Sequence, residues 1–575
     1  MRRTTRTAED LRALAAVARG EAPADLYLAG GRVLNVYSGE VLEANVAVAR
    51  GRVAYVGRRR TMVGEPTTVL DVTGRLLVPG YFDPHCHPGA MYTPVTLAEA
   101  VLPRGTVAAV ADTLFPLVYA DPARLEPVLQ DLSRLPFHYY WFLRLHAQAP
   151  LPEEAERFAP DRLERLLHLE PVRTAGEVTR WPLLQAGDPR LTELVAAALA
   201  AGRRVEGHAP GVGWERLQAL VAAGVSSDHE AITAEQALDR LRAGLYVMLR
   251  HSSLRGDLPA LAAVASSARA FSGRLMLTPD GPDATFVVDH GYMDAVIRQA
   301  LLAGVDPVAA YQMATLNPAT YYGLDEELGG IAPGRLADLN VLVDLRDPTP
   351  ERVIAGGRLV AEEGRLIAPI EAPEWVSAFP RRYAPTWRPD PSLFAPPRGA
   401  AIALHLQNAV ITRRRDLTLS DGPPPGVQVL TLLAPDGRWV ARALLSGFAD
   451  RLGGLACTYT VGGGMAVAGD DPHDMAAAAR RALELGGGVV AVEDGQVRLE
   501  LPLPIGGLMS PEPLPRLAAR VRELSAFLRA RGYRHEDPTY TLFFLSFDSL
   551  PDLRLTALGV WDARAGRVLV PREER

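Results

Sequence analysis

The sequence predicts an α/β fold in which a (β/α)8 barrel of the TIM type is inserted into a small β-sandwich domain and is followed by a C-terminal mixed α/β domain. The first supporting observation is that strand-like and helix-like stretches alternate between residues 81 and 325, as a parallel barrel requires. The second is that short strands with glycine turns lie on both flanks of that segment. The third is length, because 575 residues exceed what one hydrophobic core supports.

The two flanks of the alternating segment are expected to form one β domain. Residues 1–20 have the periodicity of a short amphipathic helix, and residues 25–56 carry short strands. A similar strand texture returns at residues 329–364. Since chain ends that lie close together make insertion easy, both stretches belong to one domain. The predicted division is 1–80 and 326–370 for the β domain, 81–325 for the barrel, 371–398 for a proline-rich linker and 399–575 for the C-terminal α/β domain.

Several helix-then-strand units are clear inside the barrel segment. They are residues 97–102 with 106–112, 191–201 with 204–208, 217–223 with 225–229, and 234–243 with 245–249. In such barrels the chemistry lies at the carboxyl ends of the strands, so polar residues that end these runs are candidates for function. The C-terminal domain shows strands at 401–404 and 427–433 and helices at 475–485 and 514–530; we expect it to support the fold and an oligomer contact, with active-site lining as the alternative.

Composition sets limits on partners and compartment. The chain is 48% hydrophobic and 22% charged, typical of a soluble globular protein, and its net charge of −6 gives no support for a nucleic-acid partner. No apolar stretch predicts a signal peptide or a membrane span. Two cysteines, Cys86 and Cys457, cannot build a disulfide framework, so we expect a cytoplasmic protein.

The chain contains no lysine, so all 61 basic residues are arginine. This absence excludes a Schiff-base lysine, a phosphate-binding P-loop lysine and a carbamylated lysine that bridges two metal ions.

The most informative stretch is 78–88, Val-Pro-Gly-Tyr-Phe-Asp-Pro-His-Cys-His-Pro, at the start of the predicted barrel. Alternate side chains of an extended segment point to the same side, so His85 and His87 face one point while Cys86 faces away. Neutral imidazole is the commonest metal ligand, although a pair of loop histidines without a metal is the alternative.

Four further residues end strand-like runs at spacings that fit the barrel. A barrel of about 250 residues has about 31 residues in each of its eight units. The intervals are 92 residues from His85 to Glu177, 31 to His208, 21 to His229 and 51 to Asp280. They put these residues on strands 1, 4, 5, 6 and 8. Four histidines and two carboxylates are enough ligands for two divalent ions.

The order His-x-His, Glu, His, His, Asp resembles the metal-dependent amidohydrolase superfamily, and its surroundings resemble bacterial adenine deaminase, of which the chain is a divergent member. Near the ligands the resemblance is carried by Gly176-Glu177-Val178, Gly207-His208-Ala209-Pro210-Gly211 and Ser227-Asp228-His229-Glu230. Other matching stretches are 102–106, 233–238, 312–319, 331–335, 484–488 and 501–510, so the resemblance covers nearly the whole chain.

The chain departs from the family pattern at four places near the predicted site. Residues 88–91 read Pro-Gly-Ala-Met instead of Ile-Glu-Ser-Ser, and 112–115 read Asp-Thr-Leu-Phe instead of Asp-Pro-His-Glu. Residues 460–464 read Thr-Val-Gly-Gly-Gly instead of His-Asp-Ser-His-Asn, and 278–280 read Thr-Pro-Asp instead of Thr-Asp-Asp. Because buried polar groups discriminate strongly between substrates, these changes bear on the substrate more than on the metal ligands.

The resemblance implies metal-dependent hydrolytic deamination of adenine, or a related aminopurine, to hypoxanthine and ammonia. It implies two divalent ions per chain, manganese first and iron or zinc as alternatives, since such ligands accept all three. His85, His87 and Asp280 would hold one ion, His208 and His229 the other, and Glu177 would bridge them. Asp280 would also carry the proton from the attacking water to the leaving ammonia.

Outer carboxylates and several alternatives complete the predictions. Asp83, Asp228 and Glu230 are expected to orient the imidazoles. Asp280 also fits an ordinary turn, and His146 either faces the substrate or is packed. The alternative functions are a sister amidohydrolase that acts on another cyclic amidine or amide, and a catalytically weak binding paralogue. The expected partners are a purine base and a second copy of the chain in a homo-oligomer, with no nucleic acid and no membrane.

Overall fold

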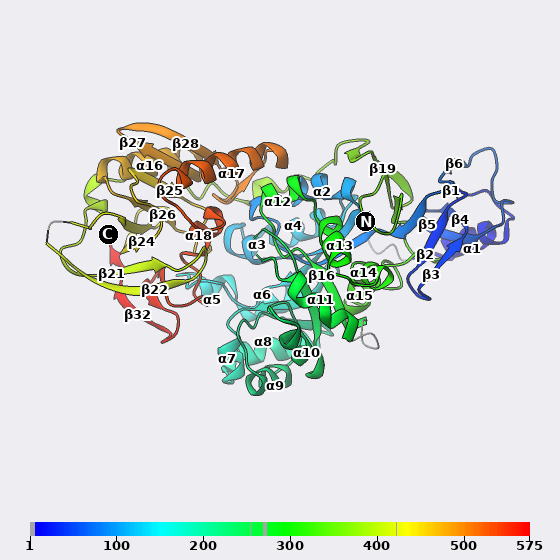
Figure 1. Ribbon diagram of the computed structural model, residues 1–575, viewed down its shortest axis with the longest axis horizontal. Coiled ribbons are helices and arrows are strands. Elements are labelled where there is room, and N and C mark those ends of the chain that lie inside the picture. Colours follow the sequence, from blue (N-terminus) through cyan, green and yellow to red (C-terminus); the bar gives the residue numbers. More distant parts are fainter. Residues whose placement is uncertain (1–5, 254, 268–272, 421) are drawn as a thin grey trace.

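The computed structural model describes residues 6–253, 255–267, 273–420 and 422–575. Along its longest axis three lobes follow one another, with the C-terminal domain at one end, the barrel in the middle and the N-terminal β domain at the other end (Figure 1). Within the described residues, no helix combines the length and apolar character that a bilayer crossing requires.

The middle lobe is a barrel of eight parallel strands. They are β8 (Tyr81–Cys86), β10 (Thr106–Asp112), β11 (His138–Leu143), β12 (Val172–Val178), β13 (Arg204–Gly207), β14 (Val225–Asp228), β15 (Tyr246–Arg250) and β16 (Leu275–Thr278). Each strand pairs in parallel with the next one along the chain, and β16 lies against β8, so the sheet closes. The predicted fold class is confirmed.

Helices cover the outside of the barrel because each has one apolar face and a defined start. In α8 (Pro189–Ala200), Asp188 caps the first turn through the Leu191 amide, and Leu191, Leu194 and Ala198 are buried. The other covering helices are α2 (Pro94–Val101), α3 (Leu114–Tyr119), α4 (Leu125–Leu132), α6 (Pro160–Leu167), α9 (Trp214–Ala222), α10 (Ala234–Arg242), α11 (Leu258–Ser267), α12 (Ala284–Asp289), α13 (Met293–Leu302), α14 (Pro307–Met313) and α15 (Leu316–Tyr321).

Strands from both sides of the barrel segment share one sheet in the β domain. Strand β7 (Leu76–Pro79) pairs in parallel with β2 (Arg32–Asn35) and antiparallel with β17 (Leu339–Leu342). The remaining elements are α1 (Ala8–Arg19), β1 (Leu26–Ala29), β3 (Glu40–Glu43), β4 (Asn45–Ala49), β5 (Arg52–Gly57), β6 (Thr68–Asp71), β18 (Arg352–Ala355), β19 (Arg358–Glu362) and β20 (Arg365–Leu366). The pairings agree with an inserted barrel, and the residue boundaries of the domains stay a prediction.

The C-terminal domain is built on a mixed sheet. Its strands are β21 (Gly399–Leu406), β22 (Thr412–Leu419), β23 (Val427–Leu433), β24 (Trp439–Ser446), β25 (Gly454–Cys457), β26 (Met465–Gly469), β27 (Gly488–Glu493) and β28 (Gln496–Pro502). Helix α16 (Pro472–Leu485) packs on β25 and β27, and α17 (Leu514–Arg529) packs on β28. A short helix, α18 (Pro538–Phe544), precedes a three-stranded sheet of β30 (Leu553–Thr556), β31 (Gly559–Asp562) and β32 (Arg567–Pro571).

The C-terminal domain and the barrel are joined at the end where the barrel strands finish. Strand β29 (Met509–Ser510) pairs with β9 (Met91–Tyr92), which follows the His-x-His stretch, and α17 packs against α12. Helix α18 lies at this junction (Figure 1). The C-terminal domain therefore meets the barrel beside the predicted site.

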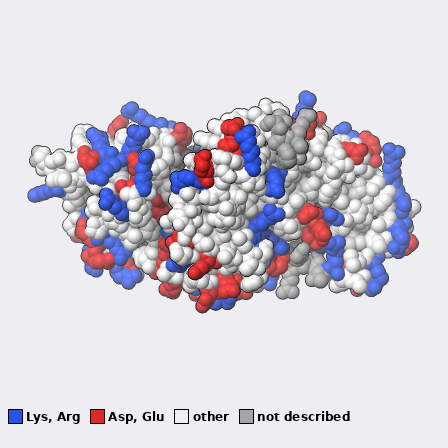
Figure 2. Space-filling model, turned by 90° about the horizontal axis from the view of Figure 1, so that it is seen from below, with Lys and Arg blue, Asp and Glu red and all other residues white. Residues whose placement is uncertain are grey.

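The surface charge is mixed. On the face drawn in Figure 2, acidic and basic side chains lie interspersed in small groups between broad uncharged areas. This distribution agrees with the small net charge of −6.

Candidate metal centre

The two histidines of the His-x-His stretch point to one place. His85 is buried at the end of β8, His87 follows the strand, and their Nε2 atoms lie 3.1 Å apart. Cys86, between them, is buried among apolar side chains of the core. The backbone alternation therefore delivers both imidazoles together, as the sequence predicts.

Asp280 joins this pair from the far end of the barrel segment. It lies two residues after β16, and its Oδ1 is 3.1 Å from His87 Nε2 and 3.5 Å from His85 Nε2. Its φ of 50° is a left-handed conformation that a non-glycine residue holds only when its surroundings impose it. The turn and the ligand position therefore coincide in the same residue.

Glu177 lies between these residues and a second pair of histidines. It is the second-last residue of β12, and its Oε1 contacts His208 Nδ1 and lies 3.2 Å from His229 Nε2. Its Oε2 is 4.0 Å from His85 Nε2. His208 follows β13 and His229 follows β14, and their facing ring nitrogens are 3.1 Å apart.

The six side chains form two halves around Glu177. We call His85, His87 and Asp280 the strand-1 half, and His208, His229 and Glu230 the strand-5/6 half. Within each of these triads, one ligand atom per residue lies within 4.8 Å of the others. Facing imidazole nitrogens about 3.1 Å apart share either a proton or a cation, and with two carboxylates beside them the donor set fits divalent ions.

Two buried carboxylates hold the rings of the strand-1 half from behind. Glu206 Oε2 lies 3.1 Å from His85 Nδ1, and Asp112 Oδ2 lies 2.9 Å from His87 Nδ1. With the Nδ1 proton directed to these oxygens, the Nε2 lone pairs of both rings point into the cluster. Sequence reasoning missed both residues; the available signal was a charged residue within or at the end of an otherwise apolar strand.

The three outer carboxylates predicted from the sequence lie around the cluster in different ways. Asp83 accepts the His85 amide at 3.1 Å and the Tyr292 hydroxyl at 2.6 Å, so it fixes backbone rather than a ring. Asp228 accepts the Ala209 amide at 2.8 Å. Glu230 lies 3.5 Å from His208 Nδ1 and 3.7 Å from His229 Nε2, so it belongs to the cluster itself. Their orienting role stays a prediction.

Comparison with known proteins places this geometry in a family. Residues 76–360 match the amidohydrolase family, and residues 409–567 match the adenine deaminase C-terminal domain. A Moorella thermoacetica protein named adenine deaminase is 34% identical over 585 residues, covering 96% of this chain and 97% of its own. A Halalkalibacterium halodurans protein provisionally named adenine deaminase BH0637 is 33% identical over 575 residues, covering 98% of each chain. The chain belongs to the adenine deaminase family. The predicted resemblance is confirmed.

Solved structures were also found that are similar to part of this adenine deaminase family member. A β-aspartyl dipeptidase from Fervidobacterium islandicum is 17% identical, with a TM-score of 0.47 over 60% of this chain and 98% of that chain.

Two buried arginines, which sequence reasoning also missed, brace the cluster. Arg144 Nη2 lies 2.5 Å from Glu177 Oε2 and 2.6 Å from Asp112 Oδ2. Arg250 Nη1 lies 2.9 Å from Asp280 Oδ2 and also pairs with Glu230. Each guanidinium therefore joins one carboxylate near the middle of the cluster to a second one. Both arginines stand at strand ends, one residue after β11 and at the last residue of β15.

These charges keep the carboxylates ionised. Burial opposes ionisation, but Arg144 and His208 hold the pKa of Glu177 well below its usual range. In the same way, against burial, His229, His87 and Arg250 hold the pKa of Asp280 well below its usual range. Burial lowers the pKa of His85 to about 4, so its ring is neutral and available as a ligand at neutral pH.

Two stretches that depart from the family pattern approach one another at the junction of the barrel with the C-terminal domain. Phe115, on α3, packs against Phe543 of α18 with ring centroids 6.0 Å apart. Tyr119, on the same helix, donates its hydroxyl to the Thr460 carbonyl at 2.9 Å. Phe115 therefore lies in an aromatic contact with the C-terminal domain, and the helix that carries it also reaches the 460–464 turn.

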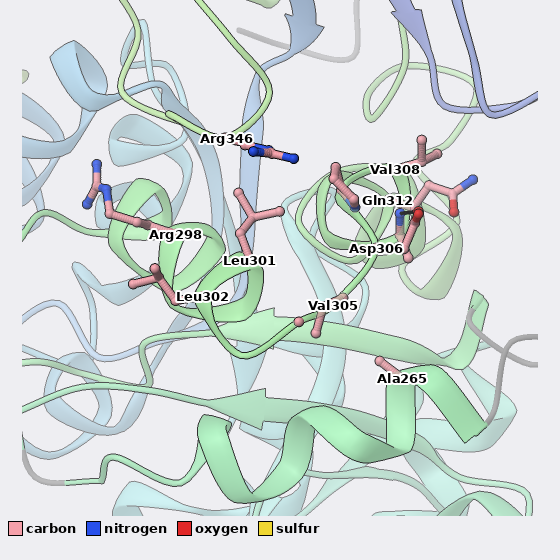
Figure 3. Close-up of a pocket in the computed structure, with 12 residues that line it drawn as sticks. Ala265, Arg298, Leu301, Leu302, Val305, Asp306, Val308, Gln312 and Arg346 are labelled. Atoms are coloured by element: carbon pink, nitrogen blue, oxygen red, sulfur yellow. Dashed lines mark hydrogen bonds between the residues drawn. The ribbon is translucent and has the colours of Figure 1, made fainter.

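His146 lies outside the cluster. Its Nδ1 is 2.8 Å from the Ala147 carbonyl, and burial lowers its pKa to about 3. A hollow of about 900 Å³ also lies elsewhere, between α13, α14 and Arg346 of the β domain (Figure 3). Leu301, Val305 and Arg298 line it, and none of its lining residues belongs to the cluster.

Proposed function

We propose that this protein catalyses the metal-dependent hydrolytic deamination of adenine to hypoxanthine and ammonia. The observation that carries the proposal is the position of Glu177 between two pairs of imidazoles at the carboxyl ends of the barrel strands. Membership in the adenine deaminase family over 96–98% of the chain supports the substrate.

The proposed ligands follow the two halves of the cluster. His85, His87 and Asp280 would hold one divalent ion, His208 and His229 would hold a second, and Glu177, between the two groups, would serve both. The nitrogen and carboxylate donors accept manganese, iron or zinc, and we propose manganese first. When bound, such ions lower the pKa of water towards neutrality, so that it can attack the ring carbon that carries the amino group.

Residues of this chain would transfer the proton from the attacking water to the leaving amine. Asp280 Oδ1 faces the imidazoles of the strand-1 half, where it can accept the proton released by the attacking water and pass it to the leaving amine. Arg250, 2.9 Å from the other oxygen of Asp280, holds the carboxylate in that direction. Water and adenine then give hypoxanthine and ammonia, with every atom accounted for.

A sister activity has one observation in its favour. The region around Phe115, Phe543 and the 460–464 turn is apolar where the family has polar groups. A substrate with fewer hydrogen-bonding groups than adenine, such as another cyclic amidine or amide, suits this region better. A binding paralogue without turnover is the third reading.

Ammonia release tests these readings. Metal-replete protein is assayed with adenine, N6-substituted adenines, guanine and cyclic ureas, beside His208→Ala and the exposed control His473→Ala. We expect adenine turnover by the wild type and the control, and a loss of about 100-fold or more in His208→Ala. If none of the purines releases ammonia, the proposal is overturned. A metal content of less than about one ion per chain favours the binding paralogue.

We also propose a cytoplasmic location, a role in purine salvage and a homo-oligomer. The two cysteines, both buried and unpaired, support a reducing compartment.

A further inference from the structure

The segment Tyr540–Asp548 of the C-terminal domain covers the mouth of the barrel. It comprises most of α18 and the four residues after it, and α18 lies where the C-terminal lobe meets the barrel (Figure 1). We call this segment the wall. It contacts the barrel at three separate points around the mouth.

The first point is Phe547 beside His208. The ring centroids are 6.4 Å apart at 67°, an edge-to-face arrangement, and Phe547 is 3% exposed. Within the cluster, His208, His87 and Asp280 are the partly exposed side chains, at 15%, 18% and 13%, whereas His85 and His229 are at 0% and 1%. The cluster is therefore partly open at His87, Asp280 and His208, and Phe547 lies beside the last of these.

The second point is Tyr540 at the loop that carries Asp280. The Tyr540 hydroxyl donates to the carbonyl of Gly281, the residue directly after Asp280. Asp280 and Gly281 are both left-handed, with φ of 50° and 65°. A Cβ at Gly281 would lie 3.1 Å from His87 Cδ2, so this turn is packed closely on the cluster. Tyr540 holds from outside a backbone conformation that Asp280 does not prefer by itself.

The third point is Asp548, which anchors the end of the wall. Its carboxylate lies 2.9 Å from Arg180 Nη2, and Arg180 Nη1 lies 2.6 Å from Glu154. The Asp548 amide donates to the Gln148 carbonyl at 3.1 Å. Gln148 follows strand β11 and Arg180 follows β12, so the wall is fixed to the loops after barrel strands 3, 4 and 8.

Between these points the wall is aromatic. Phe543 and Phe544 have ring centroids 5.1 Å apart, and Phe544 and Phe547 5.5 Å apart. Tyr540 stacks on Phe544 at 5.5 Å and 16°. The rings therefore pack on one another as a continuous set that ends beside His208, and an aromatic side chain at that place suits contact with a planar heterocycle.

We propose that this wall is part of the active site, in which Phe547 contacts the substrate ring and Tyr540 is a positioning residue for Asp280. The substrate part of this inference rests on the proposed function, whereas the positioning part concerns the metal centre alone. The C-terminal domain is then a component of the site and more than a support for the barrel.

The first experiment compares Phe547→Leu with Phe448→Leu. Phe448 is buried against Tyr533 inside the C-terminal domain, so its variant reports the cost of losing a ring there. We expect Phe547→Leu to raise KM for adenine about three- to tenfold with kcat and metal content little changed, and Phe547→Tyr to restore KM. Equal KM values for Phe547→Leu and Phe448→Leu overturn the substrate contact.

The second experiment compares Tyr540→Phe with Tyr533→Phe on manganese-loaded protein. Tyr533 is a matched control because its hydroxyl bonds Thr541 at 2.6 Å within the same domain. We expect Tyr540→Phe to release manganese to a chelator several-fold faster than the wild type, and Tyr533→Phe to release it at the wild-type rate. Melting temperatures of both variants report folding.

The two failures are distinguishable. If the wild type releases no ammonia from adenine, the proposed function falls, and manganese release by Tyr540→Phe decides the positioning part alone. A release rate equal to that of Tyr533→Phe overturns the positioning role of Tyr540, whatever the substrate is.

Discussion

The two halves of the metal centre are held in different ways. In the strand-1 half, both imidazoles have a buried carboxylate behind them, Glu206 for His85 and Asp112 for His87. In the strand-5/6 half, the carboxylates that contact His208 are Glu177 and Glu230, which lie within the cluster. The neighbour of His208 outside the cluster is Phe547, an apolar ring from another domain.

This difference shows that the barrel interior directs both imidazoles of the strand-1 half, whereas His208 of the other half lies against a ring of the C-terminal domain. Outer carboxylates set the tautomer and the direction of a ligand ring, and their loss typically weakens metal binding. An apolar ring limits space and water but directs no lone pair. The two imidazoles of the strand-1 half are therefore preorganised within the barrel, whereas His208 depends on how the two domains meet.

The largest expected effect comes from Asp280→Asn, which alters the strand-1 half where proton transfer is proposed. An amide keeps the size of the carboxylate but accepts no proton, so we expect kcat for adenine to fall about 10²–10⁴-fold. Asp283→Asn is the control, since Asp283 lies in the same loop and caps α12, a role that asparagine also fills. A kcat within tenfold of the wild type would remove Asp280 from the chemistry.

The next effect sharpens the contrast between the halves. Glu206→Ala removes the partner of His85 Nδ1, so we expect the affinity for the strand-1 ion to fall about 10–100-fold while the affinity for the other ion is unchanged. Metal content after dialysis against buffered manganese measures this. Glu206→Gln keeps an acceptor oxygen for the ring and should lose less. If Ala and Gln behave alike, the contact does not direct the ring.

The six candidate ligands could be picked out from the sequence because a barrel repeats at a regular interval and places its chemistry at strand ends. His85, Glu177 and His229 all follow from that rule. The carboxylates behind the rings, Glu206 and Asp112, could not be predicted in this way, because the spacing of the strands does not determine how an imidazole is rotated. Arg144 and Arg250 were missed because the role of a buried arginine can be predicted only when the positions of the two carboxylates that it contacts are known.

The wall was outside the reach of the sequence for a different reason. Tyr540 and Gly281 are separated by 259 residues, and they meet only through the docking of two domains. In the sequence, a cluster of aromatic residues around a short helix predicts an ordinary hydrophobic core. Phe543 and Phe547 do in fact belong to the buried core cluster. The fold class could be predicted from local periodicity alone. Predicting this contact requires the relative arrangement of two whole domains.

A smaller effect is expected when the metal is removed by a chelator. Because the strand-1 half is preorganised and the other half is not, we expect manganese to leave in two phases, with the strand-5/6 ion lost first. The ion content and the activity are followed together against chelator concentration. In Glu206→Ala the two phases should merge, since the better-held half is weakened. A single phase in the wild type would contradict unequal halves.

The smallest effect concerns the stability of the junction itself. Asp537 caps α18, and burial, with the charge of Asp283, raises its pKa to about 6. An acid whose pKa is raised in the folded state binds its proton more tightly there than in the unfolded chain. Its contribution to stability is therefore complete below about pH 4 and is lost as the pH rises through about 6.

Asp537→Asn removes this titration and keeps an oxygen for the Thr539 and Tyr540 amides. We expect its melting temperature to exceed that of the wild type by a few degrees at pH 8 and to match it near pH 4, because at low pH both side chains are uncharged. Asp471→Asn, at the exposed cap of α16, should give no such gain. A lower melting temperature for Asp537→Asn at pH 8 would mean that the carboxylate stabilises the junction as an anion, and the wall would then be held by charge rather than by apolar packing.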